Sequence, residues 1–75
     1  MGAFGDKVAD LRKERGLTVK EVCHLVGIPQ SRLIELERGV RIPTPGQINK
    51  LETYFGIKAG GLAELAKIKA SSQSN

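Results

Sequence analysis

Apolar residues in the first part of the chain recur at the three- and four-residue spacing of an amphipathic helix. One side of a helix over residues 4–15 carries Phe4, Val8, Leu11 and Arg15. Gly16 follows directly, and glycine at this place suits the left-handed conformation that commonly ends a helix. The pattern therefore predicts a first helix over residues 4–15.

A second, shorter helix is predicted to begin after Thr18. The Thr18 hydroxyl can accept a hydrogen bond from the amide of Glu21, and the Glu21 carboxylate can accept one from the amide of Thr18, which together form a capping box. The apolar face that follows consists of Val19, Val22, Cys23 and Val26. Gly27 ends this pattern, so we expect roughly two turns of helix.

A third helix is predicted from Pro29 to Arg38, because a proline in the first helical turn lacks only an amide hydrogen that has no intrahelical acceptor there. Leu33 and Leu36 fall together on the side that would face the core, and Gly39 follows the last residue. The opposite, largely polar side carries Gln30, Ser31, Ile34, Glu35 and Arg38.

Two further helices are predicted in the second half of the chain. A second capping box, formed by Thr44 and Gln47, has proline at the first helical position. Gly56 ends this fourth helix, whose apolar stripe consists of Ile48, Leu51 and Phe55. A fifth helix is predicted over residues 59–69, with apolar positions at Leu62, Leu65 and Ala66.

The whole pattern predicts one all-α domain, because 75 residues leave no room for a second and no segment alternates as a strand would. We expect this domain to occupy residues 1–69 and a disordered polar tail to occupy residues 70–75. The expected architecture is a compact bundle of five helices.

The charge balance is compatible with a polyanionic partner. Twelve Lys and Arg against eight Asp and Glu give a formal net charge of +4, which a merely soluble basic domain could also carry. Aromatic residues make up 4% of the chain, too few for a surface on which unpaired bases stack. The composition therefore argues against a protein that binds single strands.

Catalysis and metal binding lack the residues they require. Cys23 is the only cysteine and His24 the only histidine, so no internal disulfide and no multi-residue zinc site can form from them. They follow each other directly, and consecutive helix residues point in different directions, so they do not make a nucleophile and its base. We expect Cys23 to be a small buried residue, His24 to be exposed without a function, and the chain not to be an enzyme.

Other partners find no support either. There is no glycine-rich phosphate loop, and we expect no cofactor and no small-molecule ligand. No apolar run approaches the roughly 20 residues of a membrane span, and no apolar signal region is present at the N-terminus. The expected compartment is the cytoplasm.

The predicted second and third helices fit a helix-turn-helix unit, in which the second helix enters the major groove of DNA. Gly27 and Ile28 form the short turn between them. A small side chain at Cys23 lets the two helices cross closely, and Ile28 would close the turn against the core. The sequence thus places a DNA-reading element at the centre of the bundle.

Two runs of the chain resemble the lambda-repressor/Cro-like (XRE-type) family of DNA-binding domains. They are Leu11-Arg12-Lys13-Glu14-Arg15-Gly16-Leu17-Thr18 and Glu37-Arg38-Gly39-Val40-Arg41-Ile42-Pro43-Thr44, within a resemblance over residues 4–57. It implies a lambda-repressor-like five-helix bundle that binds double-stranded DNA, usually as a homodimer on a palindromic operator, and it favours a transcriptional repressor. Many members carry glutamine where this chain has Val19, so that side chain offers no clamp to phosphate.

The same resemblance assigns base-reading positions to the predicted third helix, at Gln30, Ser31 and Glu35. Gln30 has the chemistry for a bidentate contact to adenine, and Glu35 can accept from the amino group of cytosine. Ile34, on the same side, can touch a thymine methyl group or mark a protein contact. The alternative for all of them is an ordinary solvated helix face.

Positions at or beside the backbone contacts of the family are occupied by Arg32, Arg38 and Arg41. Their guanidinium groups would hold the helix on phosphates, although Arg41 can equally be a surface loop residue. Thr18 and Lys20 can hold another phosphate at the start of the second helix, where backbone amides and the helix dipole also favour an anion.

Glu37 is expected to have a different role from Glu35. The two glutamates are two residues apart and so lie about 200° apart around the helix axis, which places Glu37 near the inward side. In the family, the matching glutamate pairs with an arginine that falls at Arg12 here. We predict a structural Arg12–Glu37 ion pair that joins the first and third helices without touching DNA, because an unpaired carboxylate at a core edge is costly.

The candidates for a dimer interface are Ile57, Leu62, Leu65 and Ile68. The apolar residues of the fifth helix can equally belong to the core, and the sequence does not divide them. An alternative function is a protein-interaction module of the same fold, of the coactivator-bridging or antitoxin type, with weak or secondary DNA binding. Residues 39–43, 50–52 and 56–58 have some resemblance to the bridging type.

Overall fold

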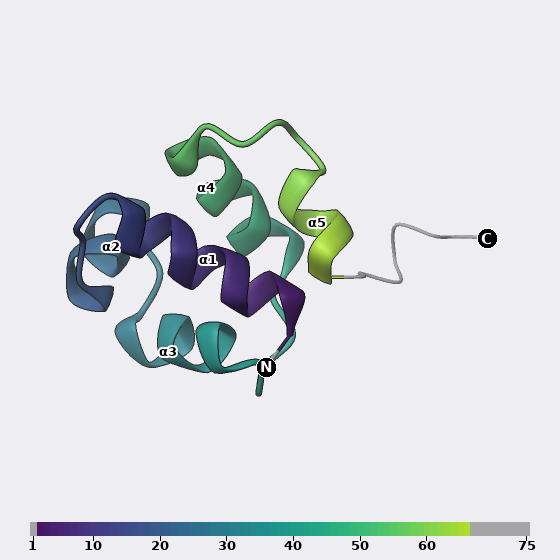
Figure 1. The fold of residues 1–75 in the computed structure, drawn as a ribbon. Coiled ribbons are helices and arrows are strands. Elements are labelled where there is room, and N and C mark those ends of the chain that lie inside the picture. The colour runs from purple at the N-terminus through teal and green to yellow at the C-terminus, as the bar shows by residue number, and fades with distance from the viewer. Residues whose placement is uncertain (1, 67–75) are drawn as a thin grey trace.

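Five helices form within residues 2–66, which are the residues that the structure, a computed structural model, describes (Figure 1). They are α1 (Ala3–Glu14), α2 (Val19–Val26), α3 (Gln30–Arg38), α4 (Pro45–Phe55) and α5 (Gly61–Ala66). No strand occurs in this part of the chain. The all-α fold class and the order of the five helices are therefore confirmed.

Local signals at the helix ends act as the sequence predicts. Both capping boxes are present: the hydroxyls of Thr18 and Thr44 each accept from the amide three residues later at 3.1 Å. In return, the side chains of Glu21 and Gln47 accept from the threonine amides at 2.8 and 3.0 Å. The glycines that follow α2, α3 and α4 are left-handed, with φ between 71° and 77°. These ends confine the helix-turn-helix to the predicted segment.

The sequence predicts Pro29 within the first turn of the third helix, but in the structure Pro29 lies just before α3. Its ψ of 142° is extended, and its carbonyl accepts a hydrogen bond from the amide of Leu33 at 3.1 Å. The proline is thus the capping residue, and the helix begins one residue later, at Gln30. Gln30 and Ser31, the first two residues of the helix, are exposed.

The start of α5 also differs from the prediction. The chain turns at Gly60, whose φ is +91°, so the helix begins at Gly61 and not at Ala59. A residue other than glycine would be strained at this position, because its Cβ disfavours left-handed backbone. Residues 67–69 of the predicted helix and the predicted tail over residues 70–75 lie outside the described residues.

α1 is central to the packing of the bundle. It contacts both α3 and α5, and it crosses the middle of the molecule between them (Figure 1). The core contains apolar side chains from all five helices and the turn: Phe4, Val8, Leu11, Val22, Cys23, Ile28, Leu33, Leu36, Ile48, Leu51, Phe55 and Leu62. Burial of this set orients every helix, so the outward side of α3 is determined by what lies beneath it.

Gly5 marks the closest approach between α1 and α3. A Cβ at this position would lie 2.5 Å from the carbonyl oxygen of Leu36 and 2.6 Å from that of Glu37. Real Cβ atoms essentially never come so close to backbone atoms, so only glycine fits without a shift of one helix. The sequence analysis did not identify this constraint, because a glycine inside a helix does not reveal what packs against it.

A buried carboxylate holds the start of α5, and the sequence analysis also missed it. Glu52 on α4 is 5% exposed. Its Oε2 accepts from the backbone amides of Gly60, Leu62 and Ala63, at 3.0, 2.9 and 3.3 Å. The first amides of a helix have no intrahelical acceptors, so Glu52 satisfies them and docks this short helix onto α4.

The sequence leaves open whether Leu62 belongs to the core or to a dimer interface, and in the structure it lies in the core. Its exposed fraction is 0%, so it cannot contact another protein without local unfolding. Ile57 and Leu65 are partly buried and pack against the same core, but part of each side chain remains accessible. Ile68 lies outside the described residues.

Candidate nucleic-acid interface

The turn between α2 and α3 is built as the sequence predicts. The amides of Gly27 and Ile28 both donate to the carbonyl of Cys23, at 2.9 and 3.2 Å, and Gly27 is left-handed with a φ of 77°. Ile28 is 3% exposed and closes the turn against the core. The two helices of the motif therefore have a fixed relative orientation.

Cys23 is a buried packing residue. Its side chain lies within the core, where burial raises the pKa of the thiol and the nearby charge of Glu37 raises it further. A buried thiol with a raised pKa is a poor nucleophile, because the thiolate is the reactive form. The cysteine thus serves packing at the base of the motif, as expected.

The outward side of α3 presents the predicted base-reading residues. Leu33 and Leu36 are buried at 0% and 1% exposure, whereas the side chains of Gln30 and Ser31 in the first turn are exposed. Ile34 is 37% exposed on the same helix. The facing that the periodicity predicts is confirmed, and Gln30 and Ser31 are accessible to a ligand.

Glu35 is not an isolated side chain on this surface. Its Oε1 accepts from Nε of Arg41 at 2.5 Å and from Nη1 of Arg32 at 3.2 Å. The hydrogen bond from Arg41 is the largest influence that lowers the pKa of Glu35, with a further contribution from Arg32. The structure therefore brings together one predicted base-reading residue and two predicted phosphate-binding residues.

The spacing of Arg32 and Glu35, three residues apart on one helix, could have indicated half of this cluster. Arg41 comes from the loop between α3 and α4, and its contact to Glu35 depends on how that loop folds back. No periodicity predicts such a contact. The sequence analysis placed all three residues near DNA but did not predict that they bind one another.

Arg12 and Glu37 form a bidentate ion pair between α1 and α3. Nε and Nη2 of Arg12 donate to the two carboxylate oxygens of Glu37 at 2.8 and 3.0 Å, and Nη1 donates to the carbonyl of Leu17 at 3.0 Å. The side chains are 14% and 10% exposed. The hydrogen bonds to Glu37 raise the pKa of Arg12.

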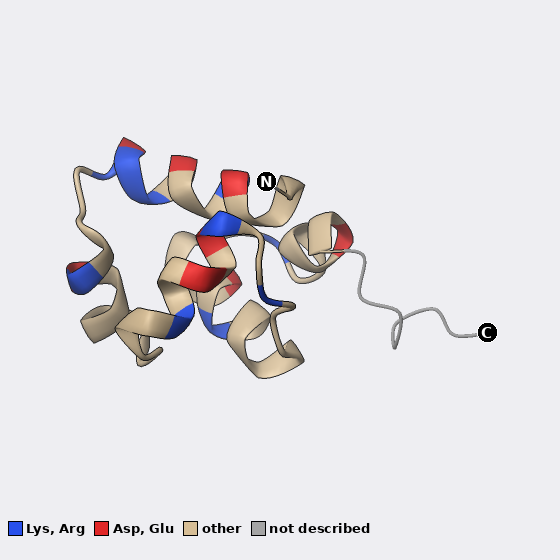
Figure 2. Cartoon of the chain, turned by 90° about the horizontal axis from the view of Figure 1, so that it is seen from below, with Lys and Arg blue, Asp and Glu red and all other residues tan. Residues whose placement is uncertain are grey.

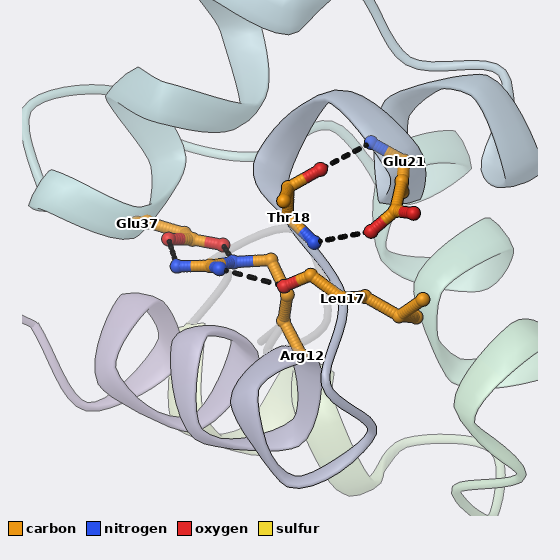
Figure 3. A network of polar contacts seen from close by, with 5 residues as sticks. All are labelled: Arg12, Leu17, Thr18, Glu21 and Glu37. Atoms are coloured by element: carbon orange, nitrogen blue, oxygen red, sulfur yellow. Dashed lines mark hydrogen bonds and ion pairs between the residues drawn. The ribbon is translucent and has the colours of Figure 1, made fainter.

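Figure 3 shows this guanidinium between the Glu37 carboxylate and the Leu17 carbonyl, next to the capping box of Thr18 and Glu21. The ion pair thus connects three segments: α1, α3 and the loop that leads into α2. Because Leu17 directly precedes Thr18, the start of α2 is held in a defined place relative to α3.

The first turn of α2 presents hydrogen-bond donors at the surface. Thr18 and Lys20 are both exposed, and the amides of Val19 and Lys20 have no intrahelical acceptor because they lie in the first turn. The Thr18 hydroxyl already accepts from Glu21, but a hydroxyl also carries one hydrogen to donate. These donors are of the kind that hold a phosphate at a helix start.

Charges of both signs are interspersed over the molecule, including the side on which α3 lies (Figure 2). Arg38 is exposed at the end of α3, and Arg41 is partly exposed in the following loop. Such a surface does not attract a polyanion uniformly, so binding would depend on particular side chains.

Two apolar residues in the loop after α3 are unusually accessible. Val40 and Ile42 are 69% and 79% exposed and flank Arg41. Both lie in a run that resembles the lambda-repressor/Cro-like family and, in part, the bridging type, and neither resemblance assigned them a contact. A large contiguous apolar patch marks a binding surface, whereas single exposed apolar residues are common on proteins.

Within residues 2–66, no group of three or more His, Cys, Asp or Glu side chains is placed to hold a metal ion. None of the described helices has the length and apolar character needed to cross a membrane.

Comparisons with known proteins agree with this geometry. Residues 8–62 match the model of a protein family described as Helix-turn-helix. The cryptic phage CTXphi transcriptional repressor RstR of Vibrio cholerae is 28% identical over 72 residues, covering 96% of this chain and 60% of that protein. The HTH-type transcriptional repressor RghR of Bacillus subtilis (strain 168) is 33% identical over 78 residues, covering 93% of this chain and 58% of that protein. The chain spans about three fifths of the length of these relatives. Among solved structures, none matches it.

Proposed function

This chain belongs to the helix-turn-helix family, and on that premise we propose that it binds double-stranded DNA sequence-specifically as a transcriptional repressor. The observation that carries the proposal is the exposure of Gln30 and Ser31 in the first turn of α3, a helix whose Leu33 and Leu36 are buried. In helix-turn-helix proteins, the start of this helix contacts base edges in the major groove. The proposal assigns the chain no enzymatic step and places it in the cytoplasm, on the nucleoid.

Base reading is assigned to four side chains of α3. Gln30 would pair with adenine in a bidentate contact, and Ile34 would touch a thymine methyl group. The Ser31 hydroxyl would form a hydrogen bond with a donor or an acceptor on a base edge. Glu35 would accept from the amino group of a cytosine. Each role requires an accessible side chain, and each of the four is at least partly exposed.

Phosphate binding is assigned to five residues around α3: Thr18, Lys20, Arg32, Arg38 and Arg41. The ion pair between Arg12 and Glu37 would keep these residues in position, because Arg12 also binds the Leu17 carbonyl and so holds the start of α2 relative to α3. Contacts to phosphate position the protein without reading sequence, so they should make binding strongly dependent on salt.

A homodimer is part of the proposal. One recognition helix covers only a few base pairs, so useful specificity requires two half-sites about 34 Å apart on one face of the DNA. Ile57 and Leu65, which are partly accessible, are candidates for the contact between the two protomers. Ile68, which lies outside the described residues, is a further candidate. Leu62 is removed from this set, since it is buried within the chain.

A second candidate function is a protein-interaction module with weak or secondary DNA binding. The exposure of Val40 and Ile42 favours it, because these apolar side chains contact little of their own chain. Under this alternative, the α3–α4 loop would bind a protein, and duplex DNA would be retained without sequence preference.

Binding-site selection from random-sequence duplexes tests the proposal. We expect a palindromic consensus, and for its binding a log-log salt slope of about −0.9 for each phosphate contact. Gln30→Ala should relax the preference at one position in each half-site, a loss of about 1–3 kcal/mol of discrimination. Asn49→Ala, an exposed amide on α4, is the matched control and should leave the consensus unchanged.

Weak retention without an enriched sequence would support the interaction module. A salt slope near zero would contradict DNA binding of either kind.

A further inference from the structure

One carboxylate oxygen on the proposed recognition helix holds two arginines. Oε1 of Glu35 accepts from Arg32, one turn earlier on α3, and from Arg41 in the loop that follows the helix. All three side chains remain partly exposed, at 43% for each arginine and 36% for the glutamate. The cluster therefore lies where DNA would lie if α3 enters the groove.

The contacts leave much of each guanidinium available. Arg41 is held through Nε and Arg32 through Nη1, and neither has another hydrogen bond to a described residue. A phosphate oxygen and a carboxylate oxygen are equivalent acceptors for a guanidinium group. Exchange of one for the other needs only side-chain rotation, because neither arginine side chain is hydrogen-bonded to the backbone of a described residue.

We propose that the Glu35 carboxylate competes with DNA phosphate for Arg32 and Arg41. When a base donates a hydrogen bond to the carboxylate, the two arginines leave Glu35 and bind phosphates of the DNA backbone. This inference rests on the proposed function. It makes Glu35 a specificity-determining residue that couples the reading of a base to the formation of two backbone contacts.

The coupling follows from what happens to the carboxylate. At a site with a cytosine amino group within reach, Glu35 gains a donor and can release its arginines. At other sites, release would leave an unpaired negative charge between two phosphate backbones, where Coulomb repulsion opposes binding. The arginines therefore stay on Glu35, and the protein forms fewer phosphate contacts with the wrong sequence.

The second arginine–glutamate pair of α3 shows why this exchange is particular to Glu35. Arg12 is held by Glu37 through two bonds and by a backbone carbonyl through a third, and both side chains are largely buried. A phosphate cannot reach that guanidinium without separating α1 from α3. Of these two arginine–glutamate contacts of α3, the Glu35 cluster is the one that combines partial exposure with spare donors.

Glu35→Gln tests the proposal, because it removes the charge and keeps the shape. The probes are a random-sequence 30-base-pair duplex and the consensus duplex that selection on the unaltered protein recovers. We expect affinity for the random duplex to rise about three- to tenfold, the scale of one or two exposed ion pairs. The log-log salt slope on that duplex should steepen by about 0.9 for each arginine released.

Affinity for the consensus should rise less or fall, so the ratio of specific to random binding drops. Glu64→Gln, an exposed carboxylate on α5, makes the same change in net charge and should raise binding to both duplexes equally and slightly. Arg41→Ala combined with Glu35→Gln should show about half of the steepening, because one of the two released contacts is gone.

Two results would overturn the inference. One is a Glu35→Gln protein that binds random DNA with unchanged affinity and slope. The other is weaker binding to both duplexes that Arg41→Ala does not worsen, since Glu35 would then position Arg41 for DNA. Failure of the unaltered protein to bind any duplex would instead contradict the proposed function, so the two failures are distinguishable.

Discussion

The two sides of α3 use the same pair of side-chain types in different surroundings. On the inward edge, Glu37 and Arg12 are 10% and 14% exposed and join two helices through a bidentate contact. On the outward side, Glu35 holds Arg41 at the surface. Burial raises the cost of losing a partner, whereas solvent and salt weaken an exposed pair. Losing a partner should therefore cost more stability in the inward pair than in the outward pair.

The largest effect is expected where α1 meets the inward side of α3. Gly5→Ala would place a Cβ 2.5 Å from the Leu36 carbonyl oxygen, and neither backbone can yield without moving a helix. We expect a loss of about 3 kcal/mol, at the upper end of overpacking effects. Denaturant unfolding monitored by circular dichroism measures it.

Gly46→Ala is the matched control for this change, because Gly46 is also helical but its added Cβ would meet only the Thr44 hydroxyl, at 3.9 Å. It should raise stability by about 0.5–1 kcal/mol. Equal effects of the two substitutions would mean that the close approach of α1 and α3 does not limit stability.

The next effect concerns the inward ion pair. Glu37→Ala leaves the Arg12 guanidinium largely buried without its carboxylate, which should lower stability by about 1–3 kcal/mol. For a domain of this size, that corresponds to about 4–8 °C in melting temperature for each kcal/mol. DNA-site preference should stay unchanged in the folded variant, measured by selection below its melting temperature. A changed consensus with an unchanged melting temperature would reverse the roles assigned to the two sides.

A smaller effect should appear as a function of pH on the outward side. The hydrogen bond from Arg41 lowers the pKa of Glu35 in the folded protein. The stability that this contact contributes is therefore fully present above the ordinary pKa of 4.5 and is lost as pH falls through the lower pKa of the folded state. The melting temperature of the unaltered protein should slightly exceed that of Glu35→Gln at pH 6, and the difference should vanish in acid. A difference that grows as pH falls would contradict the sign of the shift.

The contrast between the two sides also explains what the sequence could and could not predict. The helices, both capping boxes and the facing of Leu33 and Leu36 follow from local periodicity and end signals. The tight fit at Gly5 depends on a contact between distant segments, and the capping of α5 by Glu52 depends on how a loop folds back, neither of which a local pattern contains. The Glu35–Arg41 contact is missed for the same reason.

The last effect should leave stability almost untouched. Glu35→Ala removes a side chain that is exposed and whose partners remain solvated, so we expect a melting temperature close to that of the unaltered protein. We expect the set of bound sequences to change, because the residue would read a cytosine and restrain two phosphate-binding arginines. Parallel thermal melts and binding-site selections on Glu35→Ala and Glu37→Ala separate the two roles within one helix. A marked loss of stability in Glu35→Ala, with the consensus retained, would show that the exposed pair is structural and that the two sides of α3 do not differ in function.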